Sequence, residues 1–138
     1  MKQTLENQRI ILTGASGGIG SEIAKQLLKY HCKIGLVGRS EKKLQQLYSD
    51  LEKHGAKKDQ LHIITSDITT RIGQQTIIDQ MQGYFSGFDM LINTAGIMDF
   101  VDFSEQSDER IEAVINTNVI APMQLTKKVL AIMLKQQK

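Results

Sequence analysis

The 138-residue sequence contains one cysteine, one proline and no tryptophan. A lone cysteine, Cys32, excludes an internal disulfide and agrees with a reducing compartment, so we expect a cytoplasmic protein in which Cys32 is a small buried apolar residue. No apolar run approaches the roughly 18 residues that a membrane-spanning helix requires, and residues 1–9 are polar. We therefore expect no membrane partner.

The sequence also lacks the residue spacings that are typical of metal sites and of nucleic-acid binding. His31, His54 and His62 show no helical i, i+4 pairing and no cysteine or carboxylate at ligand spacing, so we predict no metal site. Seventeen Lys and Arg residues against 15 Asp and Glu give a net charge of only +2. The densest basic cluster, residues 53–58, has no interleaved aromatic side chains to stack bases, so we expect no nucleic-acid partner.

The composition, 41% apolar and 23% charged, is that of one globular domain spanning residues 1–138. Apolar runs predict strands near residues 10–12, 34–37, 61–65 and 89–93, and helical spacing predicts helices near 19–28, 40–55 and 70–81. Strands and helices alternate four times. This alternation predicts an α/β fold with a doubly wound parallel sheet, because each right-handed crossover places its helix on a face of the sheet.

The final third of the chain combines an apolar connection with a long helical pattern. The pattern runs from about residue 107 to residue 134, and Pro122 is expected to kink or subdivide it because proline lacks a backbone donor. Residues 97–103 are unusually apolar for a connection. They form either the wall of a cleft or a contact with other structure, or they are buried against the core of this domain.

A glycine-rich loop, residues 13–20, lies where the first strand turns into the first helix. Helix starts expose unpaired N–H groups and partial positive charge, and glycine admits a bulky anion, so the pyrophosphate of a dinucleotide fits there. The glycines fall as Gly14-x-x-x-Gly18-x-Gly20, which is not the G-x-G-x-x-G spacing. The alternative interpretation is a flexible turn.

Three further motifs follow successive strands: Gly38-Arg39, Asp67-Ile68 and the run at residues 93–96. The carboxyl ends of strands are where open α/β sheets bind ligands. Together with the glycine loop, this set resembles the short-chain dehydrogenase/reductase family from about residue 9 to residue 133. The resemblance implies a three-layer αβα Rossmann fold, incomplete at its C-terminus.

The same resemblance implies a set of cofactor-binding residues. They are Gly14, Ser16, Gly17, Gly18, Ile19, Gly20, Arg39, Asp67, Ile68, Asn93, Ala95 and Gly96. Two have simpler alternatives, since Asp67 is also typical of a turn or cap and Asn93 of a side chain that bonds the backbone at a strand end.

The cofactor preference follows from charge at the end of the second strand. An acidic side chain there accepts from a free ribose 2′-hydroxyl, whereas this chain has Gly38 followed by Arg39. A guanidinium forms a bidentate, charge-assisted pair with a 2′-phosphate, so NADP is favoured over NAD. The alternative for Arg39 is an ordinary exposed charge.

The family's catalytic serine and Tyr-x-x-x-Lys motif are absent from this sequence, because no tyrosine is followed by lysine four residues later. Without a phenol and a neighbouring cation to lower its pKa, a proton partner for the hydride is missing. Asn118 matches the family's helix asparagine, which supports a proton-relay water, and Asn116 is a weaker candidate. Alternatively, the Asn118 amide bonds a carbonyl near Pro122.

The sequence therefore predicts the cofactor-binding half of an NADP-dependent enzyme that interconverts carbonyls and secondary alcohols, inactive by itself. The alternative is a non-catalytic dinucleotide-binding or interaction module. The strand at residues 89–93 would expose an unpaired edge, so we expect self-association or pairing with a completing chain.

Overall fold

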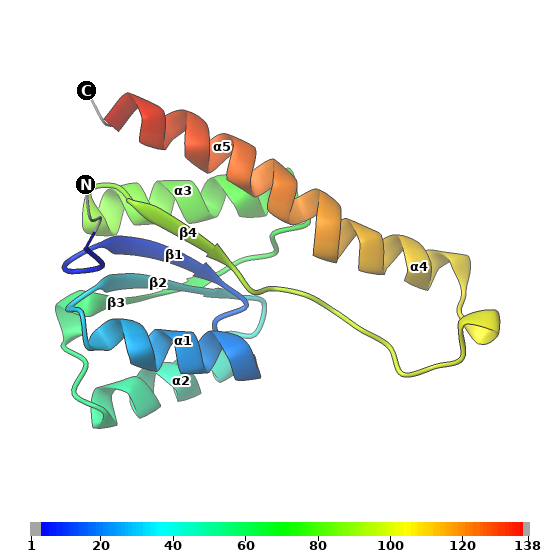
Figure 1. The fold of residues 1–138 in the computed structure, drawn as a ribbon, viewed down its shortest axis with the longest axis horizontal. Helices are drawn as coiled ribbons and strands as arrows, with labels where there is room; N and C mark the ends of the chain where they lie inside the picture. The colour runs from blue at the N-terminus through cyan, green and yellow to red at the C-terminus, as the bar shows by residue number, and fades with distance from the viewer. Residues whose placement is uncertain (1–3, 137–138) are drawn as a thin grey trace.

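Four parallel strands form one sheet in the order β3-β2-β1-β4 (Figure 1). The computed structural model describes residues 4–136. The strands are β1 (Arg9–Thr13), β2 (Lys33–Gly38), β3 (Leu61–Thr65) and β4 (Met90–Asn93). β2 and β4 flank β1 on opposite sides, so the strand order reverses at β1, which confirms the predicted doubly wound parallel sheet.

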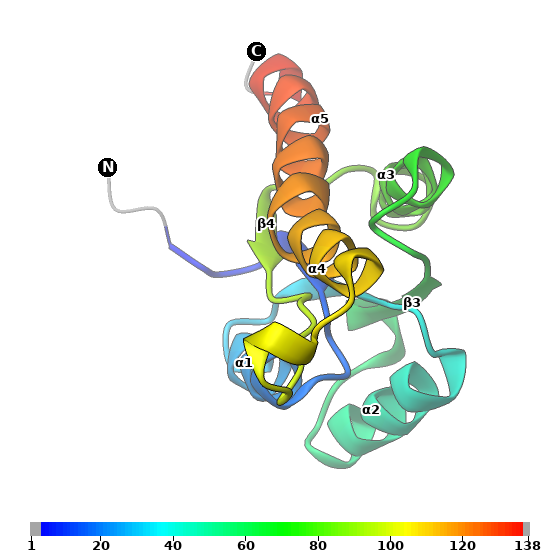
Figure 2. The ribbon, with the colours of Figure 1, turned by 90° about the vertical axis from the view of Figure 1, so that its right-hand side faces the viewer.

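Helices cover both faces of this sheet (Figure 2). The elements are α1 (Gly18–Leu28), α2 (Glu41–Lys53), α3 (Arg71–Phe85), α4 (Asp108–Ile115) and α5 (Ala121–Gln136), with short 3₁₀ turns η1 (Lys58–Gln60) and η2 (Phe103–Glu105) and a π-helical segment η3 (Asn116–Ile120). α1 and α2 pack on one face, and α3 and α5 on the other. The expected three-layer Rossmann fold is confirmed.

Successive side chains of each strand point to opposite faces of the sheet, and this divides the core into two clusters. Ile10 and Leu12 of β1 point toward α1 and α2, while Ile11 between them points toward α3 and α5. All three side chains are fully buried. A strand buried on both faces must be apolar at every position, which explains why the sequence shows continuous runs rather than alternation.

Cys32 is buried in the α1–α2 side of the core, as the sequence predicts. Its Sγ lies 3.1 Å from the carbonyl oxygen of Leu5. Burial raises the pKa of the Cys32 thiol above its ordinary value, because the thiolate would lose its hydration.

The long C-terminal helical pattern is subdivided, as predicted, but the break precedes Pro122. Residues of η3 adopt π-helical turns, in which the N–H of Ala121 bonds the carbonyl of Asn116, five residues back. Proline cannot donate, and its ring crowds the carbonyl four residues before it, here that of Asn118. The wider turn thus lies directly before the proline.

α3 is also longer than predicted, since it continues past residue 81 to Phe85 and ends at Ser86. Ser86 has a left-handed backbone conformation (φ 60°) and caps the helix through the carbonyl of Met81. The glycine signal for this end lies one residue later, at Gly87, which has φ +130° and whose N–H donates to the carbonyl of Met81 at 3.3 Å.

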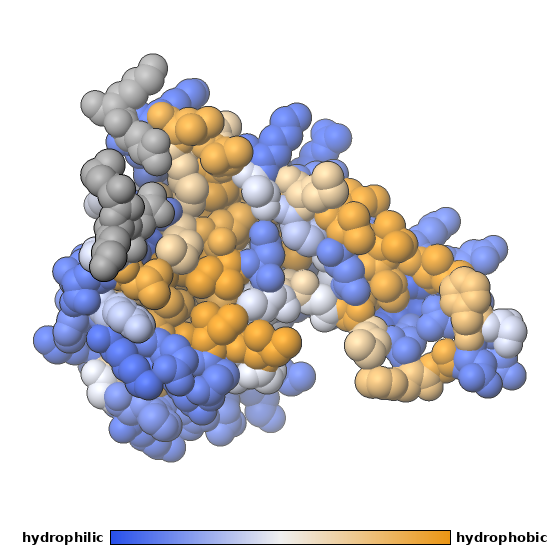
Figure 3. All heavy atoms as spheres, viewed as in Figure 1, coloured by the Kyte–Doolittle hydropathy of each residue, from blue (hydrophilic) through white to orange (hydrophobic). Residues whose placement is uncertain are grey.

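Residues 94–107 and α4 project from the sheet as an arm (Figure 1). The side chains of Met98, Val101 and Phe103 are exposed, and that of Phe100 is 95% exposed. Apolar atoms extend along this arm in Figure 3. The interpretation that residues 97–103 are buried against the domain's own core is therefore wrong.

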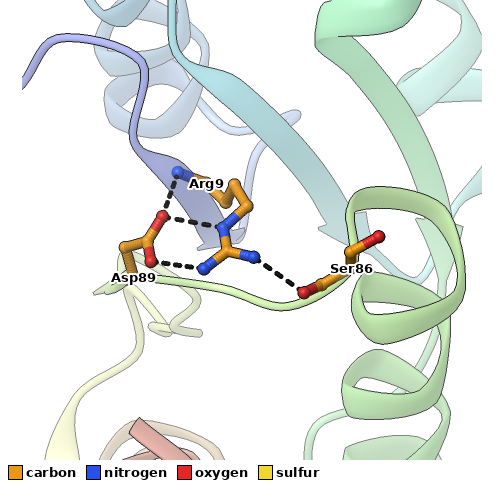
Figure 4. A network of polar contacts seen from close by, with 3 residues as sticks. All are labelled: Arg9, Ser86 and Asp89. Carbon is orange, nitrogen blue, oxygen red and sulfur yellow. Dashed lines mark hydrogen bonds and ion pairs between the residues drawn. The ribbon is translucent and has the colours of Figure 1, made fainter. Parts of the chain in front are cut away.

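An ion pair fixes the amino end of β1 to the loop before β4 (Figure 4). Nε and Nη2 of Arg9 donate to the two carboxylate oxygens of Asp89 at 2.9 and 2.6 Å, and Nη1 donates to the carbonyl of Ser86 at 2.7 Å. These hydrogen bonds lower the pKa of Asp89 below its ordinary value. The pair lies at the end of the sheet opposite the predicted site.

Candidate functional site

A pocket of about 320 Å³ opens at the carboxyl ends of the strands. It lies where the strand order reverses at β1, the position at which open α/β sheets bind ligands. Its lining residues are Gly14, Ser16, Gly17, Val37, Gly38, Arg39, Ser40, Lys43, Ser66, Asp67, Ile68, Thr69, Thr94, Ala95, Gly96, Ile97 and Thr117. Every motif that the sequence singled out after a strand contributes to this wall.

Two glycines allow the loop after β1 to pack closely. Gly14 has φ +63°, and a Cβ there would lie 2.6 Å from the backbone nitrogen of Ala95. A Cβ on Gly20 would lie 2.2 Å from the carbonyl oxygen of Gly14. These glycines shape the loop and hold α1 against it, because no larger side chain fits either place.

Gly17 and Gly18 have a different role, because they leave the start of α1 open. A Cβ built on Gly18 meets nothing within 4 Å, and Gly17 caps the helix without a side-chain bond. Among the described residues, no acceptor bonds the N–H groups of Gly18, Ile19 or Gly20. An anion at this helix start would therefore find free donors, the positive end of the helix dipole and no obstructing side chain.

Two threonines that the sequence analysis missed hold the loops after β1 and β4 together. Thr94 Oγ1 donates to the carbonyl of Thr13 at 2.6 Å. Oγ1 of the fully buried Thr13 accepts from the backbone N–H groups of Thr94 and Ala95 at 3.3 and 3.4 Å. No local sequence signal identifies this pair, because the bonds join segments that are about 80 residues apart in the chain.

The pocket wall beside β2 is cationic. Arg39 is exposed at the end of β2, and Lys43 lies one turn into α2, whose N-cap is Ser40. Within residues 4–136, neither the Arg39 nor the Lys43 side chain forms an ion pair. The sequence analysis did not include Lys43, although its position three residues after a helix cap places it beside Arg39.

Asp67 and Ile68 lie in the wall after β3. Asp67 Oδ1 accepts from the backbone N–H and the hydroxyl of Thr69 at 2.9 and 2.7 Å, so the turn interpretation of Asp67 holds alongside its place in the pocket. It is the one carboxylate among the lining residues. Ile68 is almost fully buried and presents an apolar surface beside it.

Four of the predicted cofactor-binding residues are not among those that line the pocket: Gly18, Ile19 and Gly20 at the start of α1, and Asn93 at the end of β4. Asn93 Nδ2 donates to Thr126 Oγ1 of α5 at 3.2 Å, on the far side of β4. This contact differs from the alternative in which Asn93 bonds the backbone at the strand end, because its partner is a side-chain hydroxyl. Ile19 is exposed on α1. Their assignment as cofactor ligands stays a prediction.

Asn118 holds the loop after β4 in place. Its Nδ2 donates to the carbonyl of Ile97, and its Oδ1 accepts from the N–H of Ile97, both at 2.8 Å. Ile97 lines the pocket, so the π-helical segment supports the pocket wall through one side chain. The amide does bond a backbone group, but across the fold rather than beside Pro122.

A family model for the short chain dehydrogenases matches residues 8–138. The chain belongs to the short-chain dehydrogenase family. Its relatives include the uncharacterized oxidoreductase YciK of Escherichia coli K12, 34% identical over 136 residues. The alignment covers 97% of this chain and 54% of YciK, so the chain spans about half the length of that relative.

Two solved structures superpose on this fold. A short-chain dehydrogenase/reductase of Caenorhabditis elegans, crystallised with cofactor, matches with a TM-score of 0.85 and 28% identity over 94% of this chain and 49% of its own. The L-sorbose reductase of Gluconobacter frateurii, complexed with NADPH and L-sorbose, matches with a TM-score of 0.83 and 27% identity over 96% and 50%. The family and the fold are thus established.

Residues 4–136 contain no group of three or more His, Cys, Asp or Glu side chains that could hold a metal ion. In the same residues, no helix is long and apolar enough to cross a bilayer.

Proposed function

We propose that this chain binds NADP in the pocket at the carboxyl ends of the strands and is the cofactor-binding part of an enzyme that interconverts carbonyls and secondary alcohols. The observation that carries the proposal is the open start of α1, where the N–H groups of Gly18, Ile19 and Gly20 have no acceptor. A pyrophosphate supplies the missing acceptors.

The proposed preference for NADP over NAD rests on the cationic wall. Arg39 and Lys43 flank the loop, and the pocket has no carboxylate at the end of β2 that would accept from a ribose 2′-hydroxyl. Two cations without ion pairs favour a 2′-phosphate dianion. The NADPH complex of L-sorbose reductase supports the same class of ligand.

The remaining lining residues would hold the other parts of the dinucleotide. Asp67 and Ile68 would contact the adenine, one by a hydrogen bond and one by apolar contact, and Ala95 and Gly96 would border the riboses. The nicotinamide supplies a hydride acceptor or donor when bound. Asn118 would keep Ile97 beside it through the paired amide bonds.

We also propose that this chain alone turns over no substrate. A general acid is needed to protonate the carbonyl oxygen as the hydride arrives, and the sequence holds no tyrosine with lysine four residues on. A non-catalytic binding module is the second candidate, favoured by the same absence. Hydride transfer restored by a polypeptide that supplies the tyrosine and lysine would distinguish the enzyme from the module.

For partners, we propose that the free edge of β4 pairs with another strand. β4 bonds β1 on one side only, and its residues are less buried than those of β1. An edge with unpaired backbone groups is a template for strand addition. We also propose a cytoplasmic location, which rests on the single cysteine of the sequence.

Calorimetric titration with NADPH and NADH tests the function proposed for the pocket. We expect tighter binding of NADPH, and we expect Arg39→Ala to remove the difference by weakening NADPH about tenfold or more. Lys58→Ala, an exposed lysine in η1 outside the pocket, is the control for net charge. Equal affinities in the unsubstituted chain would contradict the NADP preference, and no binding of either cofactor would contradict the site.

A further inference from the structure

A second groove, of about 490 Å³, lies between α3 and α5. Its lining residues are Arg71, Gln74, Gln124, Lys127, Lys128 and Ala131. The four from α5 are spaced i, i+3, i+4 and i+7, so they form one stripe along that helix. The groove shares no lining residue with the pocket at the strand ends.

The groove gathers positive charge that nothing nearby neutralises. Arg71 approaches from α3, and Lys127 and Lys128 from α5, while no carboxylate lines the groove. None of these three side chains forms an ion pair in the described part of the chain, whereas Arg9 and Arg110 both pair with aspartates. Like charges held together at a concave surface repel one another, and a bound anion would remove that repulsion.

Gln74 gives a second, independent indication of a ligand. Its side chain is fully buried, and its Nε2 donates to the carbonyl of Ile68 at 2.8 Å and to Gln124 Oε1 at 3.1 Å. Because the backbone carbonyl of Ile68 can only accept, the nitrogen of the Gln74 amide must face it, which fixes the orientation of this amide. Gln74 Oε1 is left buried without any donor.

An acceptor without a donor is costly, and it selects the chemistry of the missing group. The cations require an anion, yet Gln74 Oε1 requires a hydrogen-bond donor. A phosphate ester that also carries a hydroxyl group satisfies both. An acidic peptide side chain does not, since an ionised carboxylate donates no hydrogen bond.

We propose that the groove between α3 and α5 binds a small hydroxylated phosphate ester. Arg71, Lys127 and Lys128 pair with the phosphate, which carries close to two negative charges at neutral pH. A hydroxyl of the same molecule donates to Gln74 Oε1 when the neighbouring side chain of Gln124 moves aside to admit it. This site is separate from the dinucleotide pocket and does not depend on the function proposed for it.

The test compares two phosphate esters on the full chain by isothermal titration calorimetry. Glycerol 3-phosphate carries phosphate and hydroxyls, whereas methyl phosphate carries phosphate alone. We expect glycerol 3-phosphate to bind about fivefold tighter. The double substitution Lys127→Gln/Lys128→Gln should weaken both ligands about tenfold or more. Lys135→Gln, in the last turn of the same helix and outside the groove, should leave both unchanged.

Gln74→Met tests the hydroxyl contact, and it should abolish the preference for glycerol 3-phosphate while methyl phosphate still binds. If this buried substitution prevents folding, the ligand pair and the lysine variants decide the question. Binding that is unaffected by Lys127→Gln/Lys128→Gln would place the phosphate elsewhere, such as at the start of α1, and overturn the proposal. Binding of a poly-glutamate peptide but of neither ester would also overturn it.

Discussion

At the residue scale, the glycines of the loop after β1 divide into those that shape it and those that leave space. Gly14 has a positive φ and contacts the backbone of the loop after β4, whereas Gly18 faces open space. The sequence pattern treats these glycines alike. Their different surroundings predict opposite consequences of the same substitution.

Gly14→Ala should destabilise the fold by about 2–3 kcal/mol, because its Cβ meets Ala95 and its backbone conformation is strained for alanine. Gly18→Ala, the matched control, should leave stability unchanged or raise it by up to about 1 kcal/mol, since alanine favours the helix. It should nevertheless weaken NADPH about tenfold by occupying the space for the pyrophosphate. Urea unfolding and calorimetry measure both effects, and a stable Gly14→Ala would contradict the packing described.

The Arg9–Asp89 pair makes stability depend on pH. Because the pKa of Asp89 is lower in the folded protein than its ordinary value of 3.8, the pair stabilises fully above that value. Its contribution falls as pH drops below 3.8 through the folded pKa. With side chains 27% and 31% exposed, we expect a contribution of about 1–2 kcal/mol.

Urea unfolding of the unsubstituted chain and of Asp89→Asn, at pH 6 and at successively lower pH values down to about 2, measures this contribution. The difference between the two unfolding free energies should be largest at pH 6 and shrink steadily below about pH 4. A difference that stays constant over this range would show that the carboxylate charge contributes nothing.

At the element scale, the π-helical segment η3 links α4 and α5 to the pocket wall. One of its two asparagines, Asn118, makes paired hydrogen bonds with Ile97, while Asn116 has no such contact with the loop. Asn118 lies in the wider π-helical turn that precedes Pro122. π-Helical turns are often found at functional sites.

Asn118→Ala should lower the hydrogen-exchange protection of the Ile97 amide and cost about 1 kcal/mol of stability, because both bonds are lost. Asn116→Ala is the matched control, from the same segment, and should leave protection at Ile97 unchanged. Equal protection of Ile97 in both variants would mean that Asn118 does not hold this loop.

At the scale of the whole molecule, apolar surface gathers on α5 and the arm (Figure 3). Leu130 and Leu134 of α5 are at least half exposed, and the edge of β4 is free. Surfaces of this kind are typical of protein–protein contacts. This arrangement supports the proposal that the chain associates through this side.

Light scattering after size exclusion should show an apparent mass that rises with concentration. Leu130→Glu/Leu134→Glu should lower that association, because the charges oppose burial of the α5 surface. Ile72→Glu, at an isolated exposed apolar position on α3, is the matched control and should have no effect. A mass equal to one chain at every concentration would contradict the proposal.

The sequence was enough to predict the elements and the place of the site, because buried strands and helix caps leave local signals. Thr70, which caps α3, and Ser40, which caps α2, show this. Contacts between segments that are distant in the sequence leave no such signal. The Thr13–Thr94 bonds and the groove at Gln74 could therefore be recognised only in the structure. The contact of Asn93 with Thr126 likewise depends on packing between β4 and α5.

The central claim is that a dinucleotide binds at the start of α1. Nuclear magnetic resonance of the ¹⁵N-labelled chain during titration with NADP⁺ tests it most directly. If a dinucleotide binds there, we expect saturable shifts of the Gly17, Gly18 and Ile19 amides, together with those of Ile68 and Ala95 across the pocket. Shifts that spare these amides, or that gather on α5 instead, would contradict it.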